Sequence, residues 1–160
     1  MSGRGAPDLP VVDATGLELG IVAATWHADI VDALLDSAVQ AAHACGIPRP
    51  TVVRVPGSLE IPVVAMDLSD VCDALVALGL VLRGGTVHFD HVCRVVADGC
   101  ARVAVDSGIP VGSGVLMCET MEQARDRAGL PGAAEDKGRE ATLAALQTAV
   151  VLRELRRVIK

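Results

Sequence analysis

The sequence predicts an α/β fold in which a parallel β-sheet is covered by helices on both faces. Short apolar runs, typical of strands buried on both faces, alternate along the chain with longer segments of helical periodicity. Strands that alternate with helices form a parallel sheet, because each helix carries the chain back to the edge where the next strand begins. With 160 residues, the chain is long enough for one domain with a substantial core.

Four segments have the composition of strands: residues 19–24, 51–55, 74–82 and 111–117. The third is a continuous apolar run, so we expect it to be central. In the first helical segment, polar residues recur every three or four positions, and Gly46 and Pro48 end it. The second helix should begin near Leu59 or Glu60, since Pro62 fits only a first turn. The predicted helices span residues 28–45, a segment from about 59 or 60, and residues 88–106, 120–128 and 135–159.

The two ends of the chain differ from this pattern. Residues 1–16 are rich in Gly, Pro and Asp, which predicts a flexible N-terminal arm with a short extended piece at Val11 and Val12. We expect residues 17–160 to form a single α/β domain. The last helix is apolar over more than one stripe, more than a sheet face requires, so we expect it also to contact another subunit.

Composition excludes several classes of protein. The net charge of −6 argues against a general nucleic-acid or membrane-surface binder, and two aromatic residues are too few for base stacking. The five cysteines contain no C-x-x-C pair and lie mostly in apolar stretches, as in a reducing compartment. The N-terminus lacks a signal peptide's apolar core, and the longest apolar run is half a membrane span. We expect a cytoplasmic protein.

The predicted sheet brings several polar residues to one edge, where ligands of open parallel sheets bind. Trp26 and His27 follow the first strand, residues 57–60 the second and residues 83–88 the third. Gly84-Gly85-Thr86 before a helix suits a phosphate, although a plain tight turn explains these residues equally well.

Each candidate side chain also has a structural explanation. His88 could transfer protons or only pack, and Trp26 could stack on a flat heterocycle or cap the surface. Glu60 could accept hydrogen bonds from a polyol or compensate a helix dipole. A metal site at His88, Asp90 and His91 is disfavoured because their spacing suits one helix face poorly. Together these candidates predict a pocket for a small phosphorylated substrate and an aromatic heterocycle.

The stretch ALGLVLRGGTVHFDHV, residues 77–92, resembles the strand–turn–helix signature of the lumazine synthase family, G-x-x-I/L-R-G-x-T-x-H-F. The similarity extends over nearly the whole chain from about Ala6. The Trp-His pair after the first strand is similar to that of actinobacterial members. Further segments match in order and spacing: ATWH (24–27), VPGSLEIP (55–62), IPVGSGVL (109–116), RDRAG (125–129) and AEDKG (134–138).

The resemblance implies a flavodoxin-like three-layer sandwich with a four-stranded parallel sheet, whose N-terminal arm adds a strand to a neighbouring subunit. It also implies an enzyme, a transferase that condenses 5-amino-6-(D-ribitylamino)uracil with 3,4-dihydroxy-2-butanone 4-phosphate. The products are 6,7-dimethyl-8-ribityllumazine and phosphate, in the penultimate step of riboflavin biosynthesis. Neither a cofactor nor a metal is implied.

The matched positions carry the family's roles residue by residue. His88 would transfer protons as the catalytic residue. The phosphate would be bound by Gly85 and Thr86, with Lys137 nearby and Arg127 from an adjacent subunit. The ribitylaminouracil would be bound by Trp26, Ser58, Leu59, Glu60, Leu80, Val81, Leu82 and, from the adjacent subunit, Ser113.

Four positions depart from close relatives: Ser58, Gly85, His91 and Ser113. They bear on substrate affinity more than on reaction type, and they motivate an alternative, a non-catalytic paralogue that binds a flavin or a lumazine. Members of the family are pentamers or icosahedral shells. The connection between Gly129 and Lys137 is longer than in shell formers, so we expect a homopentamer, with riboflavin synthase as a possible partner.

Overall fold

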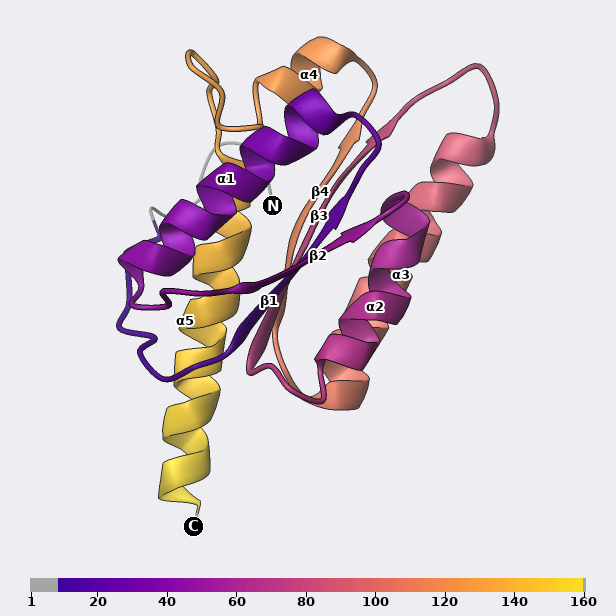
Figure 1. Ribbon diagram of the computed structural model, residues 1–160. Helices are drawn as coiled ribbons and strands as arrows, with labels where there is room; N and C mark the ends of the chain where they lie inside the picture. The colour runs from indigo at the N-terminus through magenta and orange to yellow at the C-terminus, as the bar shows by residue number, and fades with distance from the viewer. Residues whose placement is uncertain (1–8, 160) are drawn as a thin grey trace.

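The structure is a computed structural model that describes residues 9–159. Four parallel strands form one sheet in the order β2-β1-β3-β4 (Figure 1). The predicted parallel sheet and its four strands are confirmed. Only the end of the fourth strand differs, by one residue. The strands are β1 (Leu19–Ala24), β2 (Thr51–Val55), β3 (Ala74–Leu82) and β4 (Val111–Cys118).

Helices cover both faces of the sheet, as predicted. In Figure 1, α1 and α5 lie on one side of the strands, and α2 and α3 lie on the other. A 3₁₀ turn, η1, leads into α2, and the short α4 follows β4. The helical elements are α1 (Ala28–Ala44), η1 (Ser58–Glu60), α2 (Ile61–Leu68), α3 (His88–Ser107), α4 (Met121–Arg125) and α5 (Lys137–Val158).

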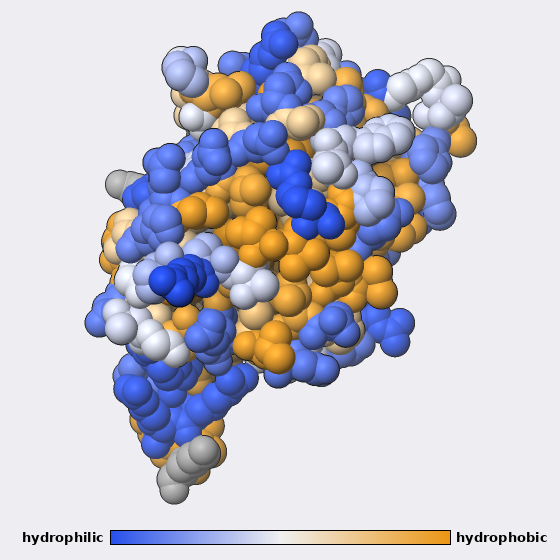
Figure 2. Space-filling view, in the orientation of Figure 1, coloured by the Kyte–Doolittle hydropathy of each residue, from blue (hydrophilic) through white to orange (hydrophobic). Residues whose placement is uncertain are grey.

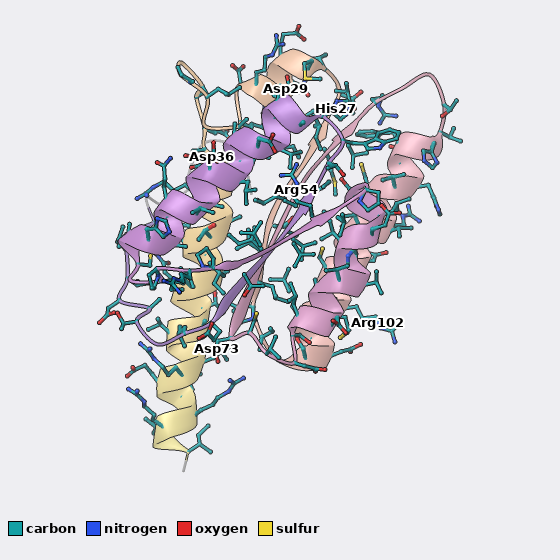
Figure 3. All side chains as sticks on the ribbon, viewed as in Figure 1. His27, Asp29, Asp36, Arg54, Asp73 and Arg102 are labelled. Carbon is teal, nitrogen blue, oxygen red and sulfur yellow. The ribbon has the colours of Figure 1, made fainter. Side chains whose placement is uncertain are left out.

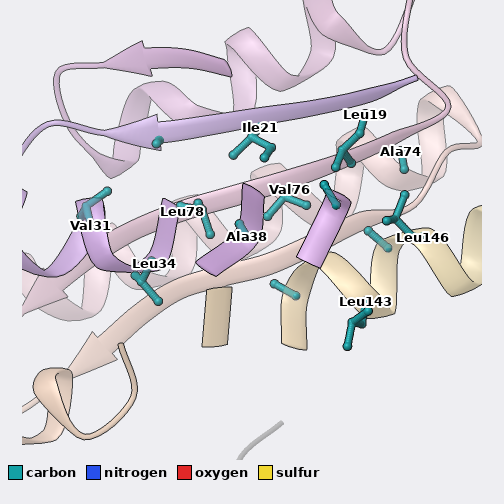
Figure 4. Packing of buried hydrophobic residues seen from close by; sticks show 14 of the residues in the cluster. Leu19, Ile21, Val31, Leu34, Ala38, Ala74, Val76, Leu78, Leu143 and Leu146 are labelled. Carbon is teal, nitrogen blue, oxygen red and sulfur yellow. The ribbon is translucent and has the colours of Figure 1, made fainter. Parts of the chain in front are cut away.

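The two central strands account for the continuous apolar runs in the sequence. Every residue of β1 is buried, as are all but the last residue of β3, because each strand has helices on both faces. Towards α1 and α5, side chains such as Ile21, Val76 and Leu146 pack into one cluster (Figure 4). A second cluster, centred on Val22, Leu75 and helices α2 and α3, fills the opposite face.

Helix α5 approaches its neighbours closely because glycines lie at the contacts. A Cβ atom on Gly138, in its first turn, would collide with the backbone of Leu34 in α1. A Cβ atom on Gly112 in β4 would collide with the backbone of Ala141. The start of α5 is therefore fixed between α1 and the edge strand. Asp136 caps it by accepting a hydrogen bond from Arg139 N at 3.0 Å, which explains why α5 begins two residues later than predicted.

The described part of the predicted N-terminal arm, residues 9–16, contacts the domain. Ala14 is fully buried, Gln147 donates to Pro10 O at 2.7 Å, and Arg153 donates to Thr15 O at 3.1 Å. These residues pair with no strand of the described chain, and the extended piece at Val11 and Val12, expected to pair with a neighbouring subunit, stays a prediction. Residues 1–8 of the predicted arm lie outside the described part.

All five cysteines are free thiols, and four of them are buried. This agrees with the interpretation of the cysteines as small apolar core residues. Burial alone raises the pKa of Cys100, in α3, to about 11. In residues 9–159, no helix is long and apolar enough to cross a membrane.

Candidate functional site

A cavity of about 400 Å³ opens at the carboxyl ends of β1, β2 and β3, the edge at which the sequence predicts the site. It is lined by apolar side chains with a few polar groups among them, as ligand pockets are. Nine of the predicted site residues line it: Trp26, Ser58, Leu59, Glu60, Leu80, Val81, Leu82, Thr86 and His88.

The segment after β1 presents Trp26 to this cavity. Thr25 ties it to the end of β2, since both its backbone N–H and its hydroxyl donate to Val55 O, at 2.8 and 2.7 Å. The next residue, His27, has a left-handed backbone with φ of 57°. Trp26 is 71% exposed and lines the cavity, so its ring is available to a ligand.

The segment after β2 folds over the cavity in a tight 3₁₀ turn. Glu60 accepts a hydrogen bond from Gly57 N at 2.9 Å, which fixes its carboxylate at the cavity wall. Glu60 thus has a structural contact, a capping hydrogen bond, and its other lone pairs can still accept from a ligand. Ser58 is buried, and its hydroxyl has no hydrogen-bond partner in the described part of the chain.

After β3, residues 84–87 lead directly into α3, whose first residue is His88. His88 is exposed and lines the cavity, and its ring centroid lies 6.5 Å from that of His91. Thr86 and Gly84 line the cavity on either side of Gly85, which does not. A phosphate at this end of the cavity would meet the N-terminus of a 20-residue helix, where N–H groups and the dipole favour an anion.

Besides Gly85, three predicted residues do not line the cavity of their own chain: Ser113, Arg127 and Lys137. Ser113 is exposed on the edge strand β4. Arg127 follows α4 and donates to Gln123 O at 2.9 Å, and its carbonyl accepts from Lys137 N at 2.9 Å. The structure therefore brings Arg127 and Lys137 together, but outside the cavity that His88 lines.

Lys137 is held by carboxylates. Its ammonium lies 2.8 Å from Glu135 and 2.6 Å from Glu140. Partial burial by itself lowers the pKa of Lys137, but the hydrogen bonds with Glu135 and Glu140 raise it overall. The same contact with Lys137 lowers the pKa of Glu135. The charge of Lys137 is therefore largely balanced within the chain.

Sequence reasoning missed part of the cavity wall. Phe89 and Val92 line it from the first turns of α3, next to His88. Val92 lies three positions after Phe89 and four after His88, so this helical spacing was the available signal. His27 and the Pro56-Gly57 pair complete the wall. No group of three or more His, Cys, Asp or Glu side chains suited to a metal occurs within residues 9–159, and Asp90 is paired with Arg83 instead.

Comparisons with known proteins identify the family of this chain. The family model described as 6,7-dimethyl-8-ribityllumazine synthase matches residues 16–153. A protein of that name from Frankia casuarinae is 59% identical over 156 residues, which cover 97% of this chain and 98% of the relative. Another from Saccharopolyspora erythraea is 58% identical over 98% of this chain and 94% of its own. A third, from a Mycobacterium species (strain KMS), is 55% identical over 96% of both chains. On this sequence similarity and fold, the chain belongs to the 6,7-dimethyl-8-ribityllumazine synthase family.

Proposed function

We infer that this chain is the enzyme that forms 6,7-dimethyl-8-ribityllumazine in riboflavin biosynthesis. It condenses 5-amino-6-(D-ribitylamino)uracil with 3,4-dihydroxy-2-butanone 4-phosphate and releases phosphate. Family membership over almost the full length supports this function. The structural observation that carries it is one cavity with an exposed indole, Trp26, at one side and a helix N-terminus with His88 at another.

These residues suit the chemical steps. The 5-amino group of the uracil attacks the ketone and an imine forms with loss of water. Phosphate then leaves, and the ring closes with loss of a second water. Every step moves protons between nitrogen, oxygen and carbon, which an exposed imidazole such as that of His88 can mediate near neutral pH. Holding both substrates in one cavity contributes through proximity and orientation.

The substrates divide the cavity between them in this proposal. Trp26 stacks on the pyrimidine ring, Glu60 accepts from ribityl hydroxyls, and the carboxyl end of β3 contributes backbone groups from residues 80–82. The phosphate binds at Gly85 and Thr86, against the N-terminus of α3.

We propose that a neighbouring copy of the chain completes the site with Ser113, Arg127 and Lys137. None of the residues that line the cavity is an Arg or a Lys, although in this proposal the cavity binds a phosphate dianion. Since two carboxylates balance the charge of Lys137, we expect Arg127 to contribute more than Lys137 to phosphate binding.

Homopentamer formation is consistent with the surface. Figure 2 shows a broad apolar area beside Arg54, over β2 and α2. Among residues 9–159, strand β2 pairs only with β1, so in this part of the chain its other edge is open to an arm from a neighbour, as proposed for the N-terminal residues. The exposed apolar side chains from η1, β2 and α2 are Val52, Leu59, Val63 and Met66. A contiguous apolar area of this kind favours a subunit interface.

The proposed reaction is tested by mixing the purified protein with both substrates and following the fluorescence of the lumazine product. We expect product formation well above the uncatalysed rate. A folded protein that gives no increase, but binds riboflavin or the lumazine tightly, would be a non-catalytic binder instead.

The shared site is tested by co-expressing two impaired variants, His88→Ala and Arg127→Ala, with different affinity tags, and assaying at a butanone phosphate concentration well below the KM of Arg127→Ala. If each site takes His88 from one chain and Arg127 from the next around a ring, random mixing restores about one quarter of the sites. Mixed oligomers purified through both tags should therefore be more active than either variant alone. Absence of recovery would mean that one chain supplies both residues.

A further inference from the structure

The turn that carries the proposed phosphate site is weakly held by its own backbone. Apart from bonds inside α3, no backbone hydrogen bond among residues 9–159 involves residues 84–87. The N-terminus of α3 has no side-chain cap, because Val87 stands at the capping position. A Cβ atom at Gly84 or Gly85 would meet nothing within 4 Å. Some other contact must fix where this turn and His88 lie.

Arg83, the residue before the turn, makes contacts that supply this restraint. Its guanidinium forms a two-pronged pair with Asp90 in the first turn of α3, with N–O distances of 2.9 and 3.3 Å. Its Nε lies 2.6 Å from a carboxylate oxygen of Glu119, just beyond β4. Its Cζ lies 4.1 Å from the ring centroid of Phe89. Arg83 precedes the turn and contacts Asp90 and Phe89, which follow it. The ion pair with Glu119 fixes Arg83 to the end of β4.

The planar guanidinium is essential to this arrangement. It presents parallel N–H groups to one carboxylate, a third N–H to another, and its face to an aromatic ring. The hydrogen bonds with Asp90 and Glu119 raise the pKa of Arg83, and that with Arg83 lowers the pKa of Asp90. The pair is therefore fully charged at neutral pH.

We propose that Arg83 is a positioning residue for the reaction, which holds the phosphate-binding turn and His88 in register with the cavity through Asp90, Glu119 and Phe89. The proposal rests on the proposed function. Arg83 does not line the cavity, so it acts through the residues that do. Both carboxylate partners are largely exposed, so these ion pairs contribute little to global stability, and their main effect is on local geometry.

The test compares Arg83→Gln, Arg83→Lys and Asp90→Asn with the wild type by steady-state kinetics. We expect Arg83→Gln to lower kcat and raise the KM for the butanone phosphate, with kcat/KM for that substrate falling by about tenfold or more. The KM for the ribitylaminouracil should change less than twofold, because its proposed contacts lie on other segments. Arg83→Lys keeps the charge but not the parallel N–H groups of the guanidinium, so its kcat/KM should fall nearly as much.

A matched control lies on the same helix. Arg102 pairs with Asp106 at 3.0 Å, four residues on, at the end of α3 remote from the cavity (Figure 3). Arg102→Gln should leave all kinetic constants unchanged. The double variant Arg83→Gln/Asp90→Asn should be no worse than Arg83→Gln alone, since both changes break the same pair.

The outcomes separate the hypotheses. If the wild type is inactive, the proposed function fails. If the wild type is active but Arg83→Gln and Asp90→Asn both keep kcat/KM within twofold, the positioning role is wrong. It is also wrong if the loss follows a parallel fall in melting temperature and affects both substrates equally. Should Arg83→Gln not fold, Asp90→Asn decides, because it leaves the pair of Arg83 with Glu119 in place.

Discussion

The cavity and the segment 126–138 both carry residues of the proposed site, but they are built differently. The cavity is a hollow at the end of three strands, with an exposed indole and imidazole and no Arg or Lys in its wall. The segment 126–138 has cations but contributes no residue to the wall of this cavity, and carboxylates already engage one of these cations. Each region has what the other lacks. This difference is what favours a site shared between chains.

The largest effect is expected at His88 in the cavity. We expect His88→Ala to lower kcat by about 100-fold or more, the usual range for loss of a proton-transfer group, with little change in either KM. Stopped-flow fluorescence of the lumazine product gives the rate. His91→Ala is the matched control, since His91 lies on the same helix but outside the cavity wall, and it should retain wild-type kcat.

Arg127→Ala tests the segment 126–138. Loss of a charged hydrogen bond to phosphate should raise the KM for the butanone phosphate by about 10- to 100-fold. The KM for the ribitylaminouracil should stay close to that of the wild type. Arg125→Ala, on the neighbouring α4, removes the same charge and should have no such effect. If the KM for the butanone phosphate rose equally in the two variants, the effect of Arg127 would be long-range electrostatic attraction and not a direct contact with the phosphate.

Trp26→Ala should affect the other substrate. Stacking on an aromatic side chain contributes about 1–3 kcal/mol per base, so we expect the KM for the ribitylaminouracil to rise by about tenfold. Trp26→Phe should restore most of the affinity. Because Trp26 is 71% exposed, thermal unfolding should hardly change, and a large fall in melting temperature would contradict the role of the indole as a ligand platform.

The smallest effect on activity is expected at Cys100, a buried thiol on α3 that belongs to neither region. Burial raises its pKa from 9.0 to about 11, so between these values the unfolded chain loses a proton that the folded chain keeps. Stability should therefore fall as pH rises from 9 to 11, by up to about 3 kcal/mol from this group.

Urea unfolding at pH 8 and pH 10.5 measures this change. Cys100→Ala should show a shallower pH dependence than the wild type, with unchanged kinetics at pH 8. Some dependence should remain, because burial also raises the pKa of Cys72 and Cys118. An identical pH dependence in variant and wild type would show that Cys100 does not titrate differently on unfolding.

The main outline of this protein could be predicted from sequence, because each feature has a local cause. The apolar runs of β1 and β3 can be stable only between two helical layers, and their ends point to one edge of a parallel sheet. Trp26, Glu60, Thr86 and His88 could be assigned to the cavity on that rule alone. The helix end before Gly46 followed from the same local chemistry, whereas the helix predicted to reach residue 128 already ends at Arg125.

Tertiary structure decided what depends on residues distant in sequence. Residues 9–16 are fixed by Gln147 and Arg153, and no local signal in a Gly- and Pro-rich segment reveals such a contact. The partners of Arg83 come from α3 and from beyond β4, so only the folded sheet brings them to one guanidinium. The separation of Arg127 from His88's cavity is likewise a property of the fold, since spacing along the chain does not define on which side of a sheet edge a loop lies.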